Sequence, residues 1–293
     1  MKKFFRTFGL CLALVALVGV SGITACDKSE FDAEKSIAVV VREDGSGTKS
    51  AFMEIIGLKG KADKKGVIVA GSTAAVLTEV KSNPLAIAYD SLGYVTDDVK
   101  KLKVEGVEAT VENIKNGTYK IARPLNVVYK EASVAEGIQK AYLDFLKSTE
   151  AQQIIKDNGY VSTYDDAVAY NATSGLSGKI EISGSTSLRP LMEKLAEKFE
   201  AVQPGTDVTV GGGGSGQGYN DAKNDVSDFG MISETFDGSK AEGCVYYEVA
   251  KDGIAVIVNK ANTFDSITME QLKNIFDTDA GSNAVTVWSQ INK

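Results

Sequence analysis

The sequence predicts an α/β fold with largely parallel sheets, and three observations support this prediction. Short apolar runs typical of strands alternate with segments of helical periodicity along the 293 residues. Three strand-to-helix turns are rich in Ser, Thr and Gly, and ligands of such sheets bind at the carboxyl ends of strands. The apolar content of 43% and the charged content of 24% are typical of a soluble globular protein. The length allows one large domain or two ordinary ones.

Residues 36–159 contain the first series of predicted elements. Ser72 is a predicted helix N-cap, the helical pattern of 133–159 breaks near Ser148, and the helix in 110–119 ends at Gly117. The predicted strands are 36–42, 66–71, 85–94 and 125–130, and the predicted helices are 47–57, 72–82, 110–119 and 133–159.

A second series of the same type follows a polar, glycine-bearing linker at 170–178. In it, residues 207–225 are predicted as a strand, a glycine loop and a helix. The other predicted strands are 179–184, 227–233 and 253–262, and the other predicted helices are 185–205 and 268–277.

The N-terminal segment is predicted to be a targeting signal and not part of the fold. A basic stretch, a short apolar stretch and Ile-Thr-Ala precede Cys26, which predicts a signal peptide over 1–25 and a lipid anchor on Cys26. The alternative is an ordinary signal peptide with an incidental cysteine. Residues 26–35 would be a polar tether, and the protein would lie outside the cell membrane, anchored to its outer face. Cleavage would leave Cys244 without a disulfide partner.

The composition disfavours several classes of function. The chain has no histidine, which excludes Ser-His-Asp triads and histidine-ligated metals, and it has no cysteine pair for zinc. The net charge is −7 for the whole chain and becomes −10 after removal of residues 1–25, which disfavours nucleic-acid binding. The composition therefore disfavours an enzyme, and we expect neither a cofactor nor a metal.

Three turns are candidate anion-binding loops: 42–48, 183–187 and 211–218. Each can present backbone N–H groups, hydroxyls and the positive end of a helix to an anion. Any single one is equally typical of a capped helix start, but three in one chain favour an anion site. A nucleotide-binding P-loop is excluded for 42–48, because Thr48 precedes Lys49 where that motif needs Gly before Lys.

Charged residues in these turns suggest which anion is bound. Arg42 could hold an oxyanion with two hydrogen bonds, or form a surface ion pair. Asp44 and Asp228 would repel a fully ionised anion such as sulfate, yet each could accept the proton of HPO4²⁻. The alternative for either aspartate is a helix cap or a turn.

Taken together, "REDGSGT", "SGSTSLRP", "GGGGSGQG" and "SDFGMIS" resemble the phosphate-binding proteins of bacterial phosphate ABC transporters. The resemblance covers nearly all of 36–293. It implies a two-lobed periplasmic-binding-protein fold of type II, in which each lobe is a mixed sheet flanked by helices and the anion lies in the interlobe cleft. It also implies a monomer that delivers inorganic phosphate to an ABC permease.

The resemblance assigns phosphate-binding roles to residues in both lobes. They are Arg42, Asp44, Ser46, Gly47 and Thr48 in one lobe, and Ser185, Thr186, Ser187, Ser215 and Asp228 in the other.

The order of the two halves differs from the family pattern. The motifs of the family's second half occupy 36–170 here, and those of its first half occupy 178–293, which predicts a circular permutation. One lobe would then be 36–123 plus 258–293, and the other would be continuous over 124–257. The alternative is a pair of half-proteins that associate with other chains.

Other functions remain open from the sequence. They are a binding protein for sulfate or molybdate, a phosphate-sensing surface protein, and an extracellular phosphatase, for which the sequence offers no nucleophile with a base.

Overall fold

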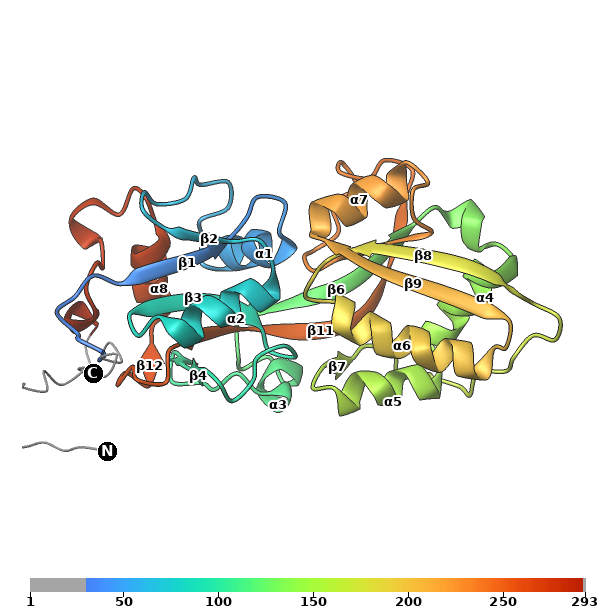
Figure 1. Ribbon diagram of the computed structural model, residues 1–293, viewed down its shortest axis with the longest axis horizontal. Helices are drawn as coiled ribbons and strands as arrows, with labels where there is room; N and C mark the ends of the chain where they lie inside the picture. The colour runs from blue at the N-terminus through green and yellow to red at the C-terminus, as the bar shows by residue number, and fades with distance from the viewer. Residues whose placement is uncertain (1–29, 292–293) are drawn as a thin grey trace, which may run out of the picture. The chain divides into compact units, whose positions relative to one another are not determined.

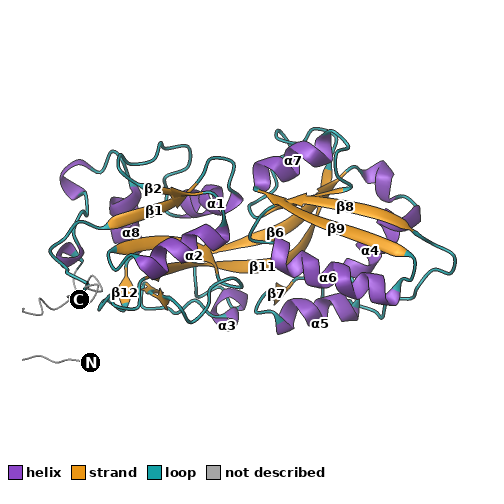
Figure 2. Cartoon of the chain, viewed as in Figure 1, coloured by secondary structure: helices purple, strands orange, loops and turns teal. Residues whose placement is uncertain are grey.

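The computed structural model describes residues 30–291 of the chain. From Phe31 onward the chain forms one compact unit in which a sheet is flanked by helices (Figures 1 and 2). The predicted α/β fold is confirmed. The predicted signal peptide, Cys26 and most of the predicted tether lie outside the described residues.

One mixed sheet runs through the compact unit, with the strand order β2-β1-β3-β11-β6-β10-β8-β9. β4 and β7 also pair with β11, and β5 pairs with β12 in a small separate sheet. The strands are β1 (Ala38–Arg42), β2 (Ile68–Ala70), β3 (Ala86–Ser91), β4 (Lys100–Lys101), β5 (Lys103–Val104), β6 (Ala122–Tyr129), β7 (Val161–Ser162), β8 (Gly178–Gly184), β9 (Thr206–Gly213), β10 (Phe229–Ile232), β11 (Val245–Val258) and β12 (Ser266–Ile267).

The sheet is less parallel than the alternating pattern predicts. β1 is parallel to β2 and β3, and β8 is parallel to β9 and β10, but β6 and β11 are antiparallel to their neighbours. β11 begins at Val245, eight residues before the predicted strand 253–262, because residues 245–253 also pair with β6. The pair β6 and β11 therefore joins the two parallel groups (Figure 1).

The helices begin near the predicted positions, except for α4, which begins at Gly137 and not at 133, and for α6. Ser46, Ser72 and Ser148 each cap a helix with the side-chain oxygen, and Ser148 separates α4 from α5 as predicted. α6 begins at Arg189 and not at 185, because Ser185 Oγ accepts a hydrogen bond from Leu188 N in a turn before the helix. The helices are α1 (Gly47–Ile55), α2 (Thr73–Ser82), α3 (Val111–Lys115), α4 (Gly137–Leu146), α5 (Thr149–Asp157), α6 (Arg189–Val202), α7 (Ser215–Lys223) and α8 (Met269–Phe276).

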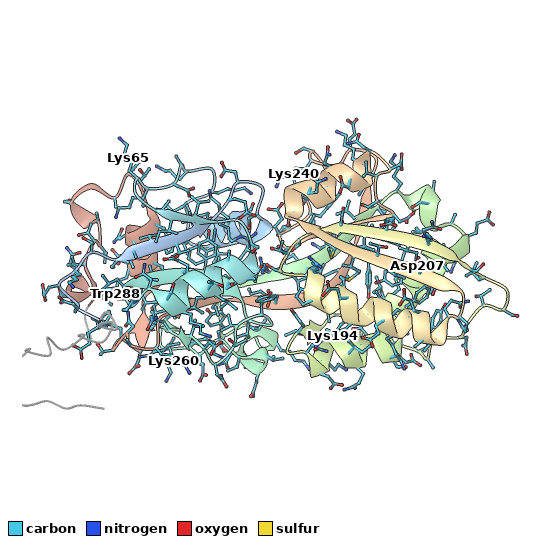
Figure 3. The ribbon with its side chains drawn as sticks, viewed as in Figure 1. Lys65, Lys194, Asp207, Lys240, Lys260 and Trp288 are labelled. Carbon is cyan, nitrogen blue, oxygen red and sulfur yellow. The ribbon has the colours of Figure 1, made fainter. Side chains whose placement is uncertain are left out.

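Two large hydrophobic cores lie on either side of the junction. The first core takes its residues from 37–121 and 254–291, with Val161 added, and contains the buried Trp288 labelled in Figure 3. The second core takes its residues from 125–250. Both segments that pass from one core to the other, β6 and β11, lie in the middle of the sheet. We call the elements around each core the first and second lobe; their boundaries stay a prediction.

Within residues 30–291, no helix has the length and apolarity needed to cross a membrane. Cys244 is a free, half-buried thiol.

Candidate anion-binding site

Several helix starts meet where strands of the two lobes end. α1 follows β1 and α2 follows β2 in the first lobe, while α7 follows β9 in the second. The first N–H groups of a helix have no partner within the helix, and the helix dipole makes this end positive. The capping serines Ser46 and Ser72 each accept only one such N–H. The remaining donors can therefore bind an anion.

Hydroxyl groups from both lobes are in direct contact at these helix starts. Thr48 Oγ1 lies 2.9 Å from Ser187 Oγ, Thr73 Oγ1 lies 3.1 Å from Thr186 Oγ1, and Thr73 Oγ1 lies 3.3 Å from Ser187 Oγ. Three of the four residues are buried and Thr186 is half-buried. Thr48, Thr186 and Ser187 come from the predicted loops. Thr73 was not predicted as a site residue, although the predicted cap at Ser72 pointed to its helix start.

Arg42 lies at the end of β1 and is 1% exposed, but its guanidinium does not have the predicted free fork. Nε and Nη2 donate to the two carboxylate oxygens of Glu43 at 2.9 and 2.7 Å. Nε also donates to Ala70 O at 3.2 Å. Two further contacts reach the hydroxyls, since Nη1 donates to Thr73 at 3.4 Å and Nη2 to Thr186 at 3.2 Å. Arg42 therefore contacts the hydroxyl cluster while its charge is balanced by its sequence neighbour.

A second buried arginine, Arg123 on β6, was missed by the sequence reasoning. Its Nη1 donates to Thr48 Oγ1 at 2.6 Å and to Ser233 O at 3.1 Å. Its Nε and Nη2 both donate to Asp252 Oδ2 on β11. The sequence did offer a signal, because Arg123 directly precedes the apolar predicted strand 125–130. An arginine that is buried with such a strand needs hydrogen-bond or charged partners. We define the hydroxyl cluster as these two arginines with Thr48, Thr73, Thr186, Ser187, Ser215 and Ser233.

Ser215 joins the cluster from the start of α7. Its Oγ accepts a hydrogen bond from Ser233 N at 3.0 Å and lies 3.4 Å from Ser233 Oγ. Gly47 of the first lobe packs against this pair so closely that a Cβ there would lie 2.2 Å from Ser215 Oγ. Gly216 N also donates to Gly45 O at 2.9 Å. The two lobes are therefore in contact at the site.

The two predicted acidic residues, Asp44 and Asp228, have other partners and lie outside the hydroxyl cluster. The side chain of Asp44 is 99% exposed and pairs with Lys49, whose hydrogen bond lowers the pKa of this carboxyl. Asp228 lies before the first residue of β10, whereas Ser233 lies after its last residue, at the opposite end of the strand. The carboxylate of Asp228 accepts hydrogen bonds from Glu181 N and from Gln139 Nε2. Ser185 and Ser46 are engaged in their own turn and cap.

Buried carboxyl groups do lie nearby, on the strands under the cluster. Asp90 on β3 is 1% exposed, its Oδ1 accepts from Ser91 N, and its Oδ2 has no hydrogen-bond partner within residues 30–291. Burial raises the pKa of Asp90 well above its usual value, although Arg42 and Arg123 oppose this. Burial also raises the pKa of Asp252, opposed by Arg123. These groups were not predicted.

A pocket of about 570 Å³ lies beside the cluster at the outer edge of the contact between lobes. It is lined by residues 44–46, by α1 residues 49, 50 and 53 and by residues 59–62 of the first lobe, and by Gly216, Glu234 and Lys240 of the second. Figure 3 labels Lys240 beside α7. The pocket connects the first N-terminal turn of α1 to solvent.

The sequence of this chain is similar to known proteins of one family. The model of the PBP superfamily domain matches residues 23–150 and 169–293. The phosphate-binding protein PstS 2 of Streptococcus agalactiae is 38% identical over 96% of this chain and 97% of its own length. The protein of the same name from Streptococcus pneumoniae is 34% identical over 96% and 98%.

The chain belongs to the bacterial phosphate-binding proteins of the PBP superfamily. A crystal structure of a phosphate-binding protein of a phosphate ABC transporter from S. pneumoniae has a TM-score of 0.69 at 32% identity, covering 88% of this chain and all of that one. The predicted family and its two-lobed fold are therefore confirmed. The phosphate-binding protein PstS of Bacillus subtilis is 33% identical over 141 residues, which is 47% of this chain and 46% of that protein.

Proposed function

We propose that this protein binds inorganic phosphate between its two lobes and delivers it to the permease of an ABC transporter. The observation that carries the proposal is the hydroxyl cluster, in which hydroxyls of both lobes contact one another next to two arginines and the starts of α1, α2 and α7. An anion held there would bridge the lobes and favour their closed arrangement over an open one. The family membership supports phosphate as that anion.

The arrangement holds an anion without net positive charge nearby. Glu43 balances Arg42 and Asp252 balances Arg123, so attraction comes from N–H groups, hydroxyls and helix dipoles. Hydroxyls can also accept a hydrogen bond, so Ser187 or Ser215 can receive the proton of HPO4²⁻. This replaces Asp44 and Asp228 as the proposed means of recognising a protonated anion.

Isothermal titration with phosphate and, in parallel, with sulfate tests the proposal. We expect saturable one-to-one binding of phosphate and weaker binding of sulfate, because the similar proteins of this family are phosphate-binding proteins. Equal binding of the two anions would favour the second candidate, a general tetrahedral-oxyanion binder. That candidate is kept because no ionised carboxylate lies in the hydroxyl cluster as described.

We further propose that the chain is a circular permutation with lobes of 36–123 plus 258–293 and of 124–257. The support is that the alignment with S. agalactiae PstS 2 spans nearly both chains, whereas that with B. subtilis PstS spans about half of each. Limited proteolysis in the 170–178 linker tests it. A chain that is cut in this linker should still bind phosphate. Under this proposal the linker joins the two positions that are the chain termini in an unpermuted family member, so the cut restores that arrangement.

We also propose membrane anchoring through a lipid on Cys26, as the sequence predicts. In the native host, Cys26→Ser should release the protein from the membrane fraction, and the wild type should carry a lipid by mass spectrometry of its N-terminal peptide. A wild-type N-terminus without lipid would contradict this part of the proposal.

A further inference from the structure

Arg123 differs from Arg42, the other arginine of the cluster, in the strand that carries it. It extends from β6, one of the two strands that join the lobes, and its side chain is 1% exposed. The same Nη1 donates to Thr48 Oγ1 in the first lobe and to Ser233 O in the second. It lies opposite Asp252 in the register of β6 and β11, and Asp252 Oδ2 accepts from both its Nε and its Nη2. Arg123 is thus held by one joining strand, β11, while it contacts both lobes.

The chemistry of this contact determines the direction of the Thr48 hydroxyl. A guanidinium has only donors, so Thr48 Oγ1 must accept from Arg123. A hydroxyl has a single hydrogen, and in Thr48 this hydrogen is then left to donate away from the arginine. Ser187 Oγ, at 2.9 Å, marks that direction, towards the middle of the cluster. Without Arg123, the same hydroxyl could instead accept from Ser187 and offer no donor there.

We propose that Arg123 is a positioning residue of the anion site, which orients the Thr48 hydroxyl so that it donates to the bound anion. The inference rests on the proposed function, because it assumes an anion in the hydroxyl cluster. Asp252 balances the charge of Arg123 and fixes its guanidinium, so Arg123 acts through the direction of a hydrogen bond and not through net charge. Removing the arginine head therefore weakens anion binding only while the Thr48 hydroxyl is present.

A double-mutant cycle tests this coupling on the full-length mature chain. Arg123→Lys keeps a positive charge beside Asp252 but loses the several donors of the guanidinium. Thr48→Val removes the hydroxyl at similar side-chain volume. The third variant combines both substitutions. Phosphate and sulfate dissociation constants are measured by calorimetry, and ligand-free melting temperatures are measured alongside. Arg189→Lys is the matched control, since Arg189 is half-exposed and pairs with Glu193 on the helix surface.

We expect Arg123→Lys to weaken phosphate binding about tenfold or more, and to weaken it less than about twofold when Thr48 is already Val. Arg189→Lys should leave the dissociation constant unchanged. Equal effects of Arg123→Lys in both backgrounds would overturn the inference, because a residue that only stabilises the junction acts independently of Thr48. If the wild type binds sulfate and not phosphate, the proposed function fails and the cycle is read with sulfate. If neither binds, both are overturned.

Should Arg123→Lys not fold, the cycle is repeated in an Arg123→Gln, Asp252→Asn background. This pair removes both buried charges together, so that neither is left uncompensated. This paired substitution should weaken phosphate binding clearly when Thr48 is present and much less when Thr48 is already Val, and additive effects would contradict the inference.

Discussion

Replacing Gly47 by Ala should prevent the lobes from closing while leaving each lobe folded. Gly47 is the first residue of α1, and its α-carbon faces the second lobe. A Cβ at this position would lie 2.2 Å from Ser215 Oγ, 2.9 Å from Ser215 Cβ and 2.9 Å from Ser233 Oγ, whereas ordinary contact begins at 3.4 Å. Rotating the Ser215 hydroxyl cannot relieve the overlap, because its Cβ and Ser233 are also too close. The lobes must separate by roughly 1 Å at this point.

The magnitude follows from the location of the clash between lobes. Overpacking of this kind costs about 1–3 kcal/mol, which corresponds to a loss of about 5- to 150-fold in affinity for a ligand that binds the closed arrangement. The ligand-free protein can avoid this cost by opening. Ala in a helix is also favoured over Gly by about 0.5–1 kcal/mol, so the melting temperature without phosphate should not fall.

Calorimetric titration with phosphate, together with ligand-free thermal unfolding, measures both parts of this prediction. Gly216→Ala is the matched control, because it changes a glycine in the first turn of α7 at the same lobe contact. Its Cβ would meet the nearest atom, Gly45 Cα, at 3.4 Å, which is ordinary contact, so affinity should stay within about threefold of wild type. Wild-type affinity in Gly47→Ala would refute the reasoning, since it would show that the bound form does not have this lobe contact.

Three further predictions concern the carboxyls and the hydroxyls. Asp90→Asn should stabilise the protein more at pH 8 than at pH 5 in urea unfolding. A carboxyl with a raised pKa contributes most stability at low pH and loses it as the pH rises through that pKa, whereas the amide does not titrate, so a pH-independent difference would contradict this. Ser187→Ala should weaken phosphate binding by about tenfold or more with little change in ligand-free melting, because the hydroxyl contacts Thr48 and Thr73 from the other lobe; unchanged affinity would remove Ser187 from the site. Asp44→Asn should leave phosphate affinity within about twofold, because its carboxylate is exposed, and a large loss would show that the side chain turns inward when phosphate binds.

The helix starts were predictable because their signals are local. Ser46, Ser72 and Ser148 cap helices within three residues of themselves, so the hydrogen bonds that define α1, α2 and α5 depend on neighbouring sequence. The loop hydroxyls of Thr48, Thr186, Ser187 and Ser215 were named for the same reason. Their gathering at one place was expected only from the resemblance to the family.

The charged residues were predicted less well because several partners are compatible with one sequence. Glu43 is the next residue after Arg42. Its carboxylate accepts the two guanidinium hydrogen bonds that were expected to hold the oxyanion. Asp44 follows directly, yet it pairs with Lys49 one helical turn further on. Asp44 lies in the turn between β1 and α1, and its direction depends on how α1 packs and not on the alternation of a strand.

The sequence by itself determined the family, the alternation of strands and helices, and the hydroxyl-bearing turns, because repeating patterns and caps act over a few residues. The tertiary structure decided which residues of those turns meet, since Thr48 and Ser187 are 139 residues apart and Arg123 and Thr48 are 75 apart. These pairs depend on the central antiparallel pair of β6 and β11, which brings the ends of two parallel groups of strands together. Arg123 could be assigned to the site only from the tertiary structure, because its contact with Thr48 depends on the position of β6 between the lobes.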